Sequence, residues 1–430
     1  MRSHLLNLSI SRFFGAAIAS LVLGSFNMQV TAEEQQVPAS DELSAAFAEL
    51  VGALQHVEKS IRQSPSFGSE AEQVAGYRHV LRSFAKGLEA EVYQHVDYPY
   101  FRILDFWLKE GGDNPDQRYA FAPIKGGETY RVWGTLGSAA RMELQIYSGR
   151  PWDGTGKSTG YLNFENIKLK EDGGFEIFIS AEEQGENWLK NPDDATTLFS
   201  RHIYDEWTDE QTGTVHIDRV GYEGRRKPPE SPQELADRMR AAAVMFSTTA
   251  TTWPASVNNR FFKGRPVNSL VPPYDTYRLG GAKGRWMSGA AFSLEPDQAL
   301  VVRMPESSAH YQALQLTDMW MASLEHGNQV SSLTRKQSIL ADDGAYYYVI
   351  SQTDPGYHNW IDSGEHSRGT VLLRWDGVQG KLEAGQYPSS FVVSVDEVAN
   401  RIPGFERVEP SSRDAVRAQR RQHLQLRSQR

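Results

Sequence analysis

Cysteine is absent from the 430-residue sequence, and this absence excludes several classes of protein. Disulfide bonds, lipoprotein attachment, cysteine nucleophiles and thiolate metal ligands cannot occur, so the fold depends on its apolar core. Positive charge is in the minority, because 45 Lys and Arg face 54 Asp and Glu and the net charge is −9. An acidic protein of this kind is a poor candidate for nucleic acid binding.

Long apolar runs are missing as well, except near the N-terminus. The run from Phe13 to Phe26 is shorter than the about 20 residues of a membrane span. Arg2 and Arg12 make this segment positive, and Val30-Thr31-Ala32 supplies small residues at which a signal peptidase cuts. We therefore expect a signal peptide at 1–32 and a periplasmic or secreted mature chain without a transmembrane helix. An uncleaved anchor is the alternative.

Two stretches of the remaining chain repeat one pattern. Asp172–Ser180 and Asp343–Ser351 each begin with Asp-Gly and continue as an apolar strand, and they lie 171 residues apart. Trp360 follows Trp188 by 172 residues, so the spacing stays nearly constant. Such an ordered series predicts an internal duplication. The fold class we predict is α+β: two tandem related antiparallel β modules, sandwich-like, with N-terminal and linking helices.

Helices are predicted in front of each module. The first covers 40–62, and the second opens at the Ser69/Glu72 capping box. The apolar stripe that we expect the second helix to bury is Val74, Tyr77, Leu81, Phe84 and Leu88. A third helix opens at Ser231, and we expect Trp253-Pro254 to close it.

These elements define the predicted domain organisation. It comprises a signal peptide (1–32), a helical N-terminal region (33–112), β module one (113–225), a linker with a helix (226–288), β module two (289–402) and a basic C-terminal tail (403–430). The tail contains six arginines: Arg413, Arg417, Arg420, Arg421, Arg427 and Arg430. We expect it to be solvated and partly frayed. An electrostatic contact with anionic lipid or an acidic partner is the alternative.

Four segments of the chain resemble one bacterial protein family. They are Gly111-Gly112-Asp113-Asn114-Pro115-Asp116, Asn187-Trp188-Leu189, Val267-Asn268-Ser269-Leu270-Val271-Pro272, and Asp354-Pro355-Gly356 through Asn359-Trp360-Ile361-Asp362. In these segments the chain is similar to the domain-of-unknown-function family 1214, which is related to proteins carrying the 1254 module. The resemblance extends from about Tyr77 to Arg374. It implies a β-rich fold and carries over no catalytic residue.

Motifs of common enzyme classes are missing. No Gly-x-Ser-x-Gly elbow occurs, and Gly280–Gly284 does not follow a strand and open a helix, as a dinucleotide-binding loop would. His358, Asp362 and His366 are four residues apart, a spacing that suits a metal on a helix. Prolines and glycines on both sides argue against a helix there. We therefore predict no metal site and identify no cofactor.

The polar cluster around Trp360 is the predicted site. Trp188 occupies the equivalent place in module one but lacks the surrounding histidines, which indicates that only one copy acquired a site. We predict His358 and Asp362 as a catalytic acid/base pair. The predicted ligand-binding residues are Tyr357, Asn359, Glu365, His366, Arg368, Asp318, Glu325 and His326.

The leading functional hypothesis is an exported protein that binds a small organic molecule, and in a stronger form also transforms it. The ligand would lie in a cleft of the second β module or between the modules. One alternative is a hydrolase or lyase that uses the His/Asp pair. Another is a non-catalytic envelope or interaction protein, so the sequence leaves open whether the protein is an enzyme.

Overall fold

The computed structural model describes residues 40–104, 106–150, 155–208, 211–279 and 281–428. The predicted signal peptide lies outside these residues. From Asp41 onward the chain forms one compact unit, to which the description below refers. Among the residues described, no helix is both long and apolar enough to cross a membrane.

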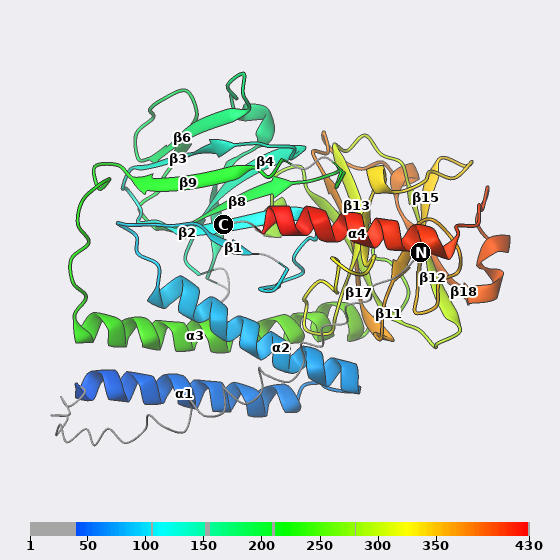
Figure 1. The fold of residues 1–430 in the computed structure, drawn as a ribbon, viewed down its shortest axis with the longest axis horizontal. Helices are drawn as coiled ribbons and strands as arrows, with labels where there is room; N and C mark the ends of the chain where they lie inside the picture. Colours follow the sequence, from blue (N-terminus) through cyan, green and yellow to red (C-terminus); the bar gives the residue numbers. More distant parts are fainter. Residues whose placement is uncertain (1–39, 105, 151–154, 209–210, 280, 429–430) are drawn as a thin grey trace, which may run out of the picture. The chain divides into compact units, whose positions relative to one another are not determined.

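Module one consists of two sheets (Figure 1). Their strand orders are β1-β2-β8-β4-β5 and β7-β6-β3-β9. The strands are β1 Arg102–Leu104, β2 Gln117–Pro123, β3 Tyr130–Thr135, β4 Arg141–Ser148, β5 Lys157–Leu162, β6 Gly174–Ser180, β7 Trp188–Lys190, β8 Ala195–Ile203 and β9 Thr214–Arg219.

Module two consists of two further sheets, in the orders β10-β11-β17-β13-β14 and β16-β15-β12-β18. The strands are β10 Tyr274–Asp275, β11 Trp286–Ser293, β12 Gln298–Pro305, β13 Tyr311–Thr317, β14 Ser332–Thr334, β15 Ala345–Ser351, β16 Trp360–Asp362, β17 Arg368–Asp376 and β18 Ser389–Ser394. Both modules start earlier than their predicted boundaries at 113 and 289, because β1, β10 and the first residues of β11 precede them. The edge strands β1 and β10 are too short to show the alternation by which a strand is recognised.

The strand orders confirm the predicted duplication. Adding nine to each strand number of module one gives the order found in module two, sheet by sheet. Even the exceptions repeat, because β6–β7 and β15–β16 are parallel while the other pairs are antiparallel. The indole Nε1 of Trp188 donates to Ser180 Oγ at 3.0 Å, and that of Trp360 donates to Ser351 Oγ at 3.0 Å. The two tryptophans therefore anchor matching turns, as predicted.

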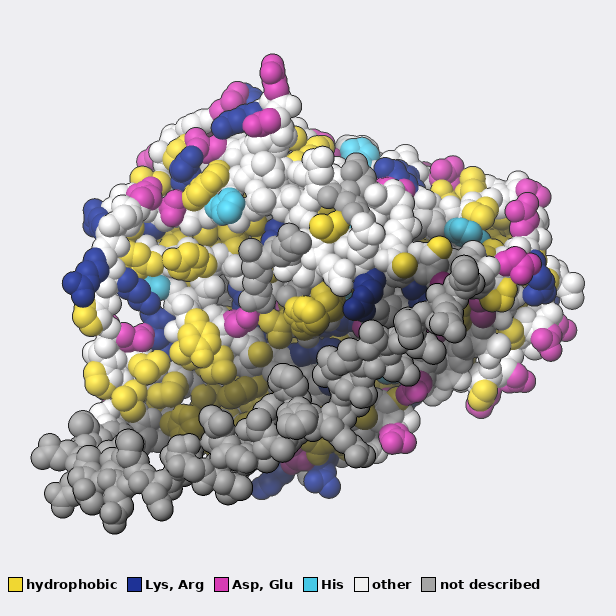
Figure 2. Space-filling view, in the orientation of Figure 1, with side chains coloured by type: hydrophobic (Ala, Val, Ile, Leu, Met, Phe, Trp, Pro, Cys, Tyr) yellow, Lys and Arg dark blue, Asp and Glu magenta, His cyan; other side chains and the backbone are white. Residues whose placement is uncertain are grey.

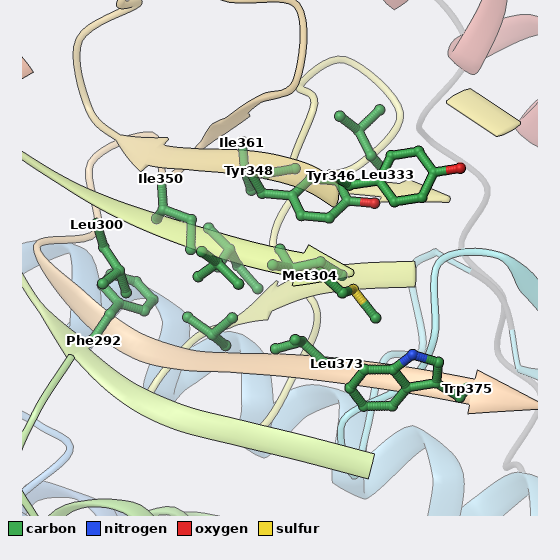
Figure 3. Packing of buried hydrophobic residues seen from close by; sticks show 14 of the residues in the cluster. Phe292, Leu300, Met304, Leu333, Tyr346, Tyr348, Ile350, Ile361, Leu373 and Trp375 are labelled. Atoms are coloured by element: carbon green, nitrogen blue, oxygen red, sulfur yellow. The ribbon is translucent and has the colours of Figure 1, made fainter. Parts of the chain in front are cut away.

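The apolar core of each module lies between its two sheets. In module two, Leu373 and Trp375 from β17 lie opposite Leu300 and Met304 from β12 (Figure 3). These side chains are buried because alternate residues of each strand point to the same face. Module one has the corresponding core, which includes Val132, Leu144 and Ile177.

Helices pack against the sheet of module two that contains β17. They are α1 Asp41–Arg62, α2 Glu70–Gly87 continued by η1 Leu88–Val92, and α3 Pro232–Val257 continued by η3 Asn258–Phe262. Val57 and Phe246 from this layer share one apolar cluster with Trp320 and Leu372.

The predicted buried stripe of α2 is wrong over its first half. Val74, Tyr77 and Leu81 are 44–63 % exposed, and the helix buries a face of small and polar residues, including Gly76 and His79. Gly76 lets Trp320 approach closely, since a Cβ at Gly76 would lie 2.6 Å from the indole. Trp320 also donates to the backbone oxygen of Glu72 at 2.9 Å. Tertiary packing with one large indole thus outweighs the apolar pattern.

Helix α3 does not end at Trp253-Pro254 as predicted, because Pro254 lies inside it. Proline has no N–H to donate to the carbonyl four residues earlier, which is that of Ala250. The buried ring of His79 takes this role, with Nε2 3.0 Å from Ala250 O. Burial lowers the pKa of His79 to about 4, so at neutral pH the ring is uncharged and donates one proton.

The C-terminal tail is also different from the prediction. It forms helix α4 (Pro410–Arg427), in which Arg413, Arg420 and Arg427 are each less than 10 % exposed. Seven-residue spacing places these arginines on one face. The helix lies along both modules (Figure 1), because Arg413 binds Asp354 of module two and Arg427 binds the backbone of Pro115 in module one. The expectation of a solvated, frayed tail is therefore wrong.

Candidate functional site

Two of the predicted ligand-binding residues have architectural roles. Asn359 is fully buried and its amide exchanges hydrogen bonds with both backbone groups of Ile339, at 2.8 Å each. Asn187 makes the same pair of bonds with Lys168 in module one. Tyr357 is buried and stacks on Phe405, with ring centroids 5.2 Å apart. Asn359 therefore supports the turn that both modules share and does not face a ligand.

The predicted acid/base pair is not joined. His358 Nδ1 lies 3.1 Å from Asn359 Oδ1, and Asp362 Oδ1 accepts from the backbone of Gly364 at 2.8 Å. Among the contacts of the described residues, no hydrogen bond or ion pair connects His358 with Asp362. Burial raises the pKa of the Asp362 carboxyl. The neighbouring Glu365 is exposed.

Arg368 and Asp318 also stabilise the fold. Arg368 forms a two-pronged ion pair with Glu72 and thereby connects β17 to α2. Asp318 is buried and accepts from the backbone of Trp320 and Ala322, at 2.8 and 3.0 Å. These bonds hold a turn in which Met321 has a φ of 62°, a conformation that costs energy for a residue other than glycine. Burial raises the pKa of Asp318, and the predicted residue His366 is half-buried.

Glu325 and His326 lie apart from this group. Glu325 Oε1 accepts from the backbone of Gly327 and Asn328 and so closes a turn. His326 is buried beside Lys109, whose Nζ lies 3.3 Å from His326 Nδ1 and donates to two backbone carbonyls. Burial lowers the pKa of Lys109 to about 8 and that of His326 well below its ordinary value. The predicted site residues therefore do not converge on one cavity.

The two modules meet through polar faces. The sequence pattern predicts that Met142, Leu144 and Ile146 are buried and that the polar residues between them face solvent. In the structure Glu143 is 1 % and Gln145 0 % exposed, because this face of β4 packs against module two. Arg141, Glu143 and Gln145 lie along one face of the strand. A polar strand face of this kind can cover a polar interface as well as face solvent, and the sequence pattern alone does not distinguish the two.

An ion pair crosses this interface. Arg285 binds both carboxylate oxygens of Asp376, at 2.5 and 2.7 Å, and its Nη2 lies 3.4 Å from Glu143 of module one. Burial disfavours the charged guanidinium, but the two carboxylates outweigh this effect and the pKa of Arg285 lies well above its ordinary value. Arg285 and Asp376 therefore form a charged pair inside the protein, since the pKa of Asp376 is lowered against the effect of burial by the charge of Arg285.

A cleft of about 250 Å³ opens between the modules, where β4 begins and β14 ends. Two equivalent short helices line it, η2 (Phe164–Asn166) after β5 and η5 (Arg335–Gln337) after β14. The lining residues are Ala140, Arg141, Phe164, Glu165 and Asp205 of module one and His310, Arg335 and Lys336 of module two. The earlier prediction includes none of these residues, since they come from five separate segments.

Charged groups of the cleft are held in a network. Arg141 Nη1 donates to Glu165 Oε1 at 2.5 Å and lies 2.6 Å from His310 Nδ1. Arg335 differs from Arg141, because it donates only to the backbone carbonyls of Ser307 and His310, and no carboxylate of the described residues pairs with it. The cleft therefore contains one guanidinium without an anionic partner in this part of the chain.

The two carboxyl groups of the cleft have opposite pKa shifts. Burial alone would raise the pKa of Glu165, but the hydrogen bonds and charge of Arg141 reverse this effect and the pKa is lowered. Burial raises the pKa of Asp205 even though Lys336 Nζ lies 3.5 Å from its Oδ2. Asp205 is 2 % exposed, and its Oδ1 has no hydrogen-bond partner among the residues described.

The described residues contain no group of three or more His, Asp or Glu that could hold a metal ion. On the face shown in Figure 2, Lys and Arg side chains lie among Asp and Glu side chains. Such mixing is unlike the continuous basic surface of a nucleic-acid-binding protein.

Comparison with known proteins supports the fold. No family model matches the chain, and no curated protein matches it. Among solved structures, an uncharacterized protein from Burkholderia cenocepacia is similar, with a TM-score of 0.76 and 25 % identity over 84 % of this chain and 100 % of that chain. A Vibrio parahaemolyticus protein has a TM-score of 0.43 and 11 % identity over 74 % and 98 % of the two chains, which is too low for an argument.

Proposed function

We propose that the protein binds a small organic anion, such as a carboxylate, in the cleft between the two modules. The cleft volume of about 250 Å³ is slightly below the ~300–1,000 Å³ of pockets for drug-sized ligands, which suits a smaller molecule. The proposal retains the expectations of export and of kinship with the 1214 family. It moves the ligand from the His358 cluster to the junction of the modules.

The observation that carries the proposal is the state of Arg335. A planar guanidinium binds a carboxylate through two parallel hydrogen bonds, and Arg335 is the lining arginine that no described carboxylate occupies. Lys336 is half exposed beside it and adds a second positive charge. Phe164 supplies an apolar surface for the rest of the ligand.

A thermal-shift titration with benzoate and benzamide tests the proposal. Benzoate should raise the melting temperature in a saturable way and benzamide, which lacks the charge, should not. Replacing Arg335 by Gln should abolish the benzoate response, whereas the exposed Arg265→Gln control should retain it. Equal responses to the two compounds, or an Arg335→Gln protein that responds like the wild type, would contradict the proposal.

A second candidate function is acid/base catalysis on the bound molecule. It is favoured by Glu165 and Asp205, whose environments shift their pKa values in opposite directions, as in pairs that divide the roles of base and acid. The prediction is hydrolysis of an ester or amide that is lost in both Glu165→Gln and Asp205→Asn while ligand binding persists. Turnover that survives both substitutions would exclude Glu165 and Asp205 as the acid and base, and no turnover in the wild type would leave the protein a binding protein only.

A further inference from the structure

A second, smaller cavity lies between the modules under the last turn of α4. Its volume is about 30 Å³, and its lining includes Asn114, Arg118, His326, Leu424 and Arg427. One water needs roughly 10–15 Å³ of such space, so the cavity can hold one or two waters or a single monatomic ion. It is separate from the cleft of the proposed function, with which it shares no lining residue.

Arg427 reaches this cavity from α4 and is 5 % exposed. Its Nη2 donates to the backbone oxygen of Pro115 at 2.7 Å. The guanidinium lies over two aromatic rings, 4.7 Å from the centroid of Trp207 and 5.2 Å from that of Tyr204. Its Nε and Nη1 are buried without a hydrogen-bond partner in the described part of the chain. Two buried cationic donors without an acceptor are costly.

The nearby carboxylates do not act as hydrogen-bond acceptors for Nε and Nη1 of Arg427. Both oxygens of Asp113 accept from Ser323, at 2.9 Å from its backbone N and 2.7 Å from its Oγ. Asp116 accepts from Tyr311 at 2.5 Å and from Trp207 at 3.1 Å. Each carboxylate is therefore occupied by hydrogen bonds of its own.

Positive charge is in excess around the cavity. Lys109 and Arg420 are buried on the side of His326, and both donate to backbone carbonyls. With Arg427 and the lining Arg118 they make four cations, beside the three carboxylates Asp113, Asp116 and Glu325. One further negative charge would balance this group, and the cavity has room for an ion of one atom.

We propose that the cavity is a binding site for a small monovalent anion of the halide class, held by one of the two unpartnered donors of Arg427. The anion balances the charge of the buried guanidinium and accepts a hydrogen bond from one of its two remaining donors. Because Arg427 belongs to the last turn of α4 and the other lining residues belong to both modules, the bound ion fastens the helix to the junction.

Thermal unfolding of the full chain at constant ionic strength tests this site. Starting from halide-free methanesulfonate buffer, chloride and bromide should each raise the melting temperature saturably, by a few degrees. Sulfate is too large for the cavity and should produce no saturable rise. Arg427→Gln should remove the halide response, and Arg421→Gln, on the exposed side of the same helix, should retain it.

Crystals of the unmodified protein grown in bromide provide a readout that does not depend on a variant that folds. We expect an anomalous scattering peak in the cavity, within hydrogen-bonding distance of Arg427. Water at this position in bromide crystals, or equal melting temperatures in chloride and methanesulfonate, would overturn the proposal. If Arg427→Gln does not fold, the bromide peak alone decides.

Discussion

Module one and module two share their strand order but differ in what covers their outer sheets. In β15 of module two every residue is buried, whereas Glu176 and Phe178 in the equivalent β6 are partly exposed. The difference arises from the segment after β18. Val398 and Ile402 from this segment pack on the outer face of module two.

This covering explains the cluster that the sequence marks as a site. Arg413 of α4 donates to both carboxylate oxygens of Asp354, at 3.0 Å each, and to the carbonyls of Tyr357 and His358. Its guanidinium also lies 5.3 Å from the ring of Trp360. Module one has no such covering on its equivalent turn among the residues described. In the second copy, Asp354 and the backbone carbonyls of Tyr357 and His358 therefore attach the C-terminal segment.

The largest expected difference between the modules concerns their equivalent tryptophans. Trp360 is 8 % exposed beneath Arg413, and Trp188 is partly exposed. Trp360→Ala should lower the free energy of unfolding by about 3–5 kcal/mol, the range for large buried aromatics. Trp188→Ala should lower the free energy of unfolding by clearly less. Urea denaturation measures both, and equal losses would show that the covering adds nothing to the turn.

The next largest effect is a pH dependence at a position where the two modules carry different residues. His202 occupies the position of Trp375 in module two, and burial lowers its pKa to about 4. The unfolded ring binds a proton near pH 6.5, so stability is lost as the pH falls from 6.5 to 4, by up to about 3 kcal/mol. His202→Phe should flatten this part of the stability curve. The test is urea denaturation at several pH values, and an unchanged curve would assign the acid sensitivity to other groups, such as His79.

Replacing Arg413 tests whether this residue holds the C-terminal segment on module two. Arg413→Ala leaves Asp354 and two carbonyls without their donor and should cost about 2–3 kcal/mol. Arg417, one helical turn later, is partly exposed and pairs with the exposed Asp414, so it is the matched control, and Arg417→Ala should change the unfolding midpoint little. Similar midpoints for the two variants would mean that Arg413 does not hold the segment.

The smallest effect concerns a feature that the modules share. Arg201 donates to Gln145 in module one, and Arg374 donates to the equivalent Gln315 in module two. Gln145→Ala and Gln315→Ala should each cost about 1–2 kcal/mol, because each leaves a buried guanidinium with one bond fewer. A loss restricted to one variant, measured by the same denaturation, would show that the duplicated pair has kept its geometry but not its energetic role.

Much of the fold was predictable, because duplication and alternation are properties of the sequence. The matching of Asp172–Ser180 with Asp343–Ser351 indicated β6 and β15, and the tryptophan turns followed from the same spacing. The burial of α2 was not predictable in this way, because it depends on Trp320, which lies far away in the sequence. The spacing of apolar residues along a helix shows which of its side chains are apolar. It does not show which residue from elsewhere in the chain will pack against the helix.

The candidate site was less predictable than the fold. Its residues Arg141, Asp205 and Arg335 come from distant segments, and no local spacing joins them. The polar cluster near Trp360 was conspicuous because its members are close in sequence. The structure assigns several of these residues to hydrogen bonds with the backbone and with α4.

The position of α4 has a consequence for the order of folding. Its bond from Arg427 to Pro115 joins residues 312 positions apart, so this contact can form only after nearly all of the chain has been synthesised. The strands of module one are available much earlier, and domains generally fold as units from the N-terminal side during synthesis. The junction is therefore closed last, and a chain that stops before Pro410 would have both modules but no helix across them.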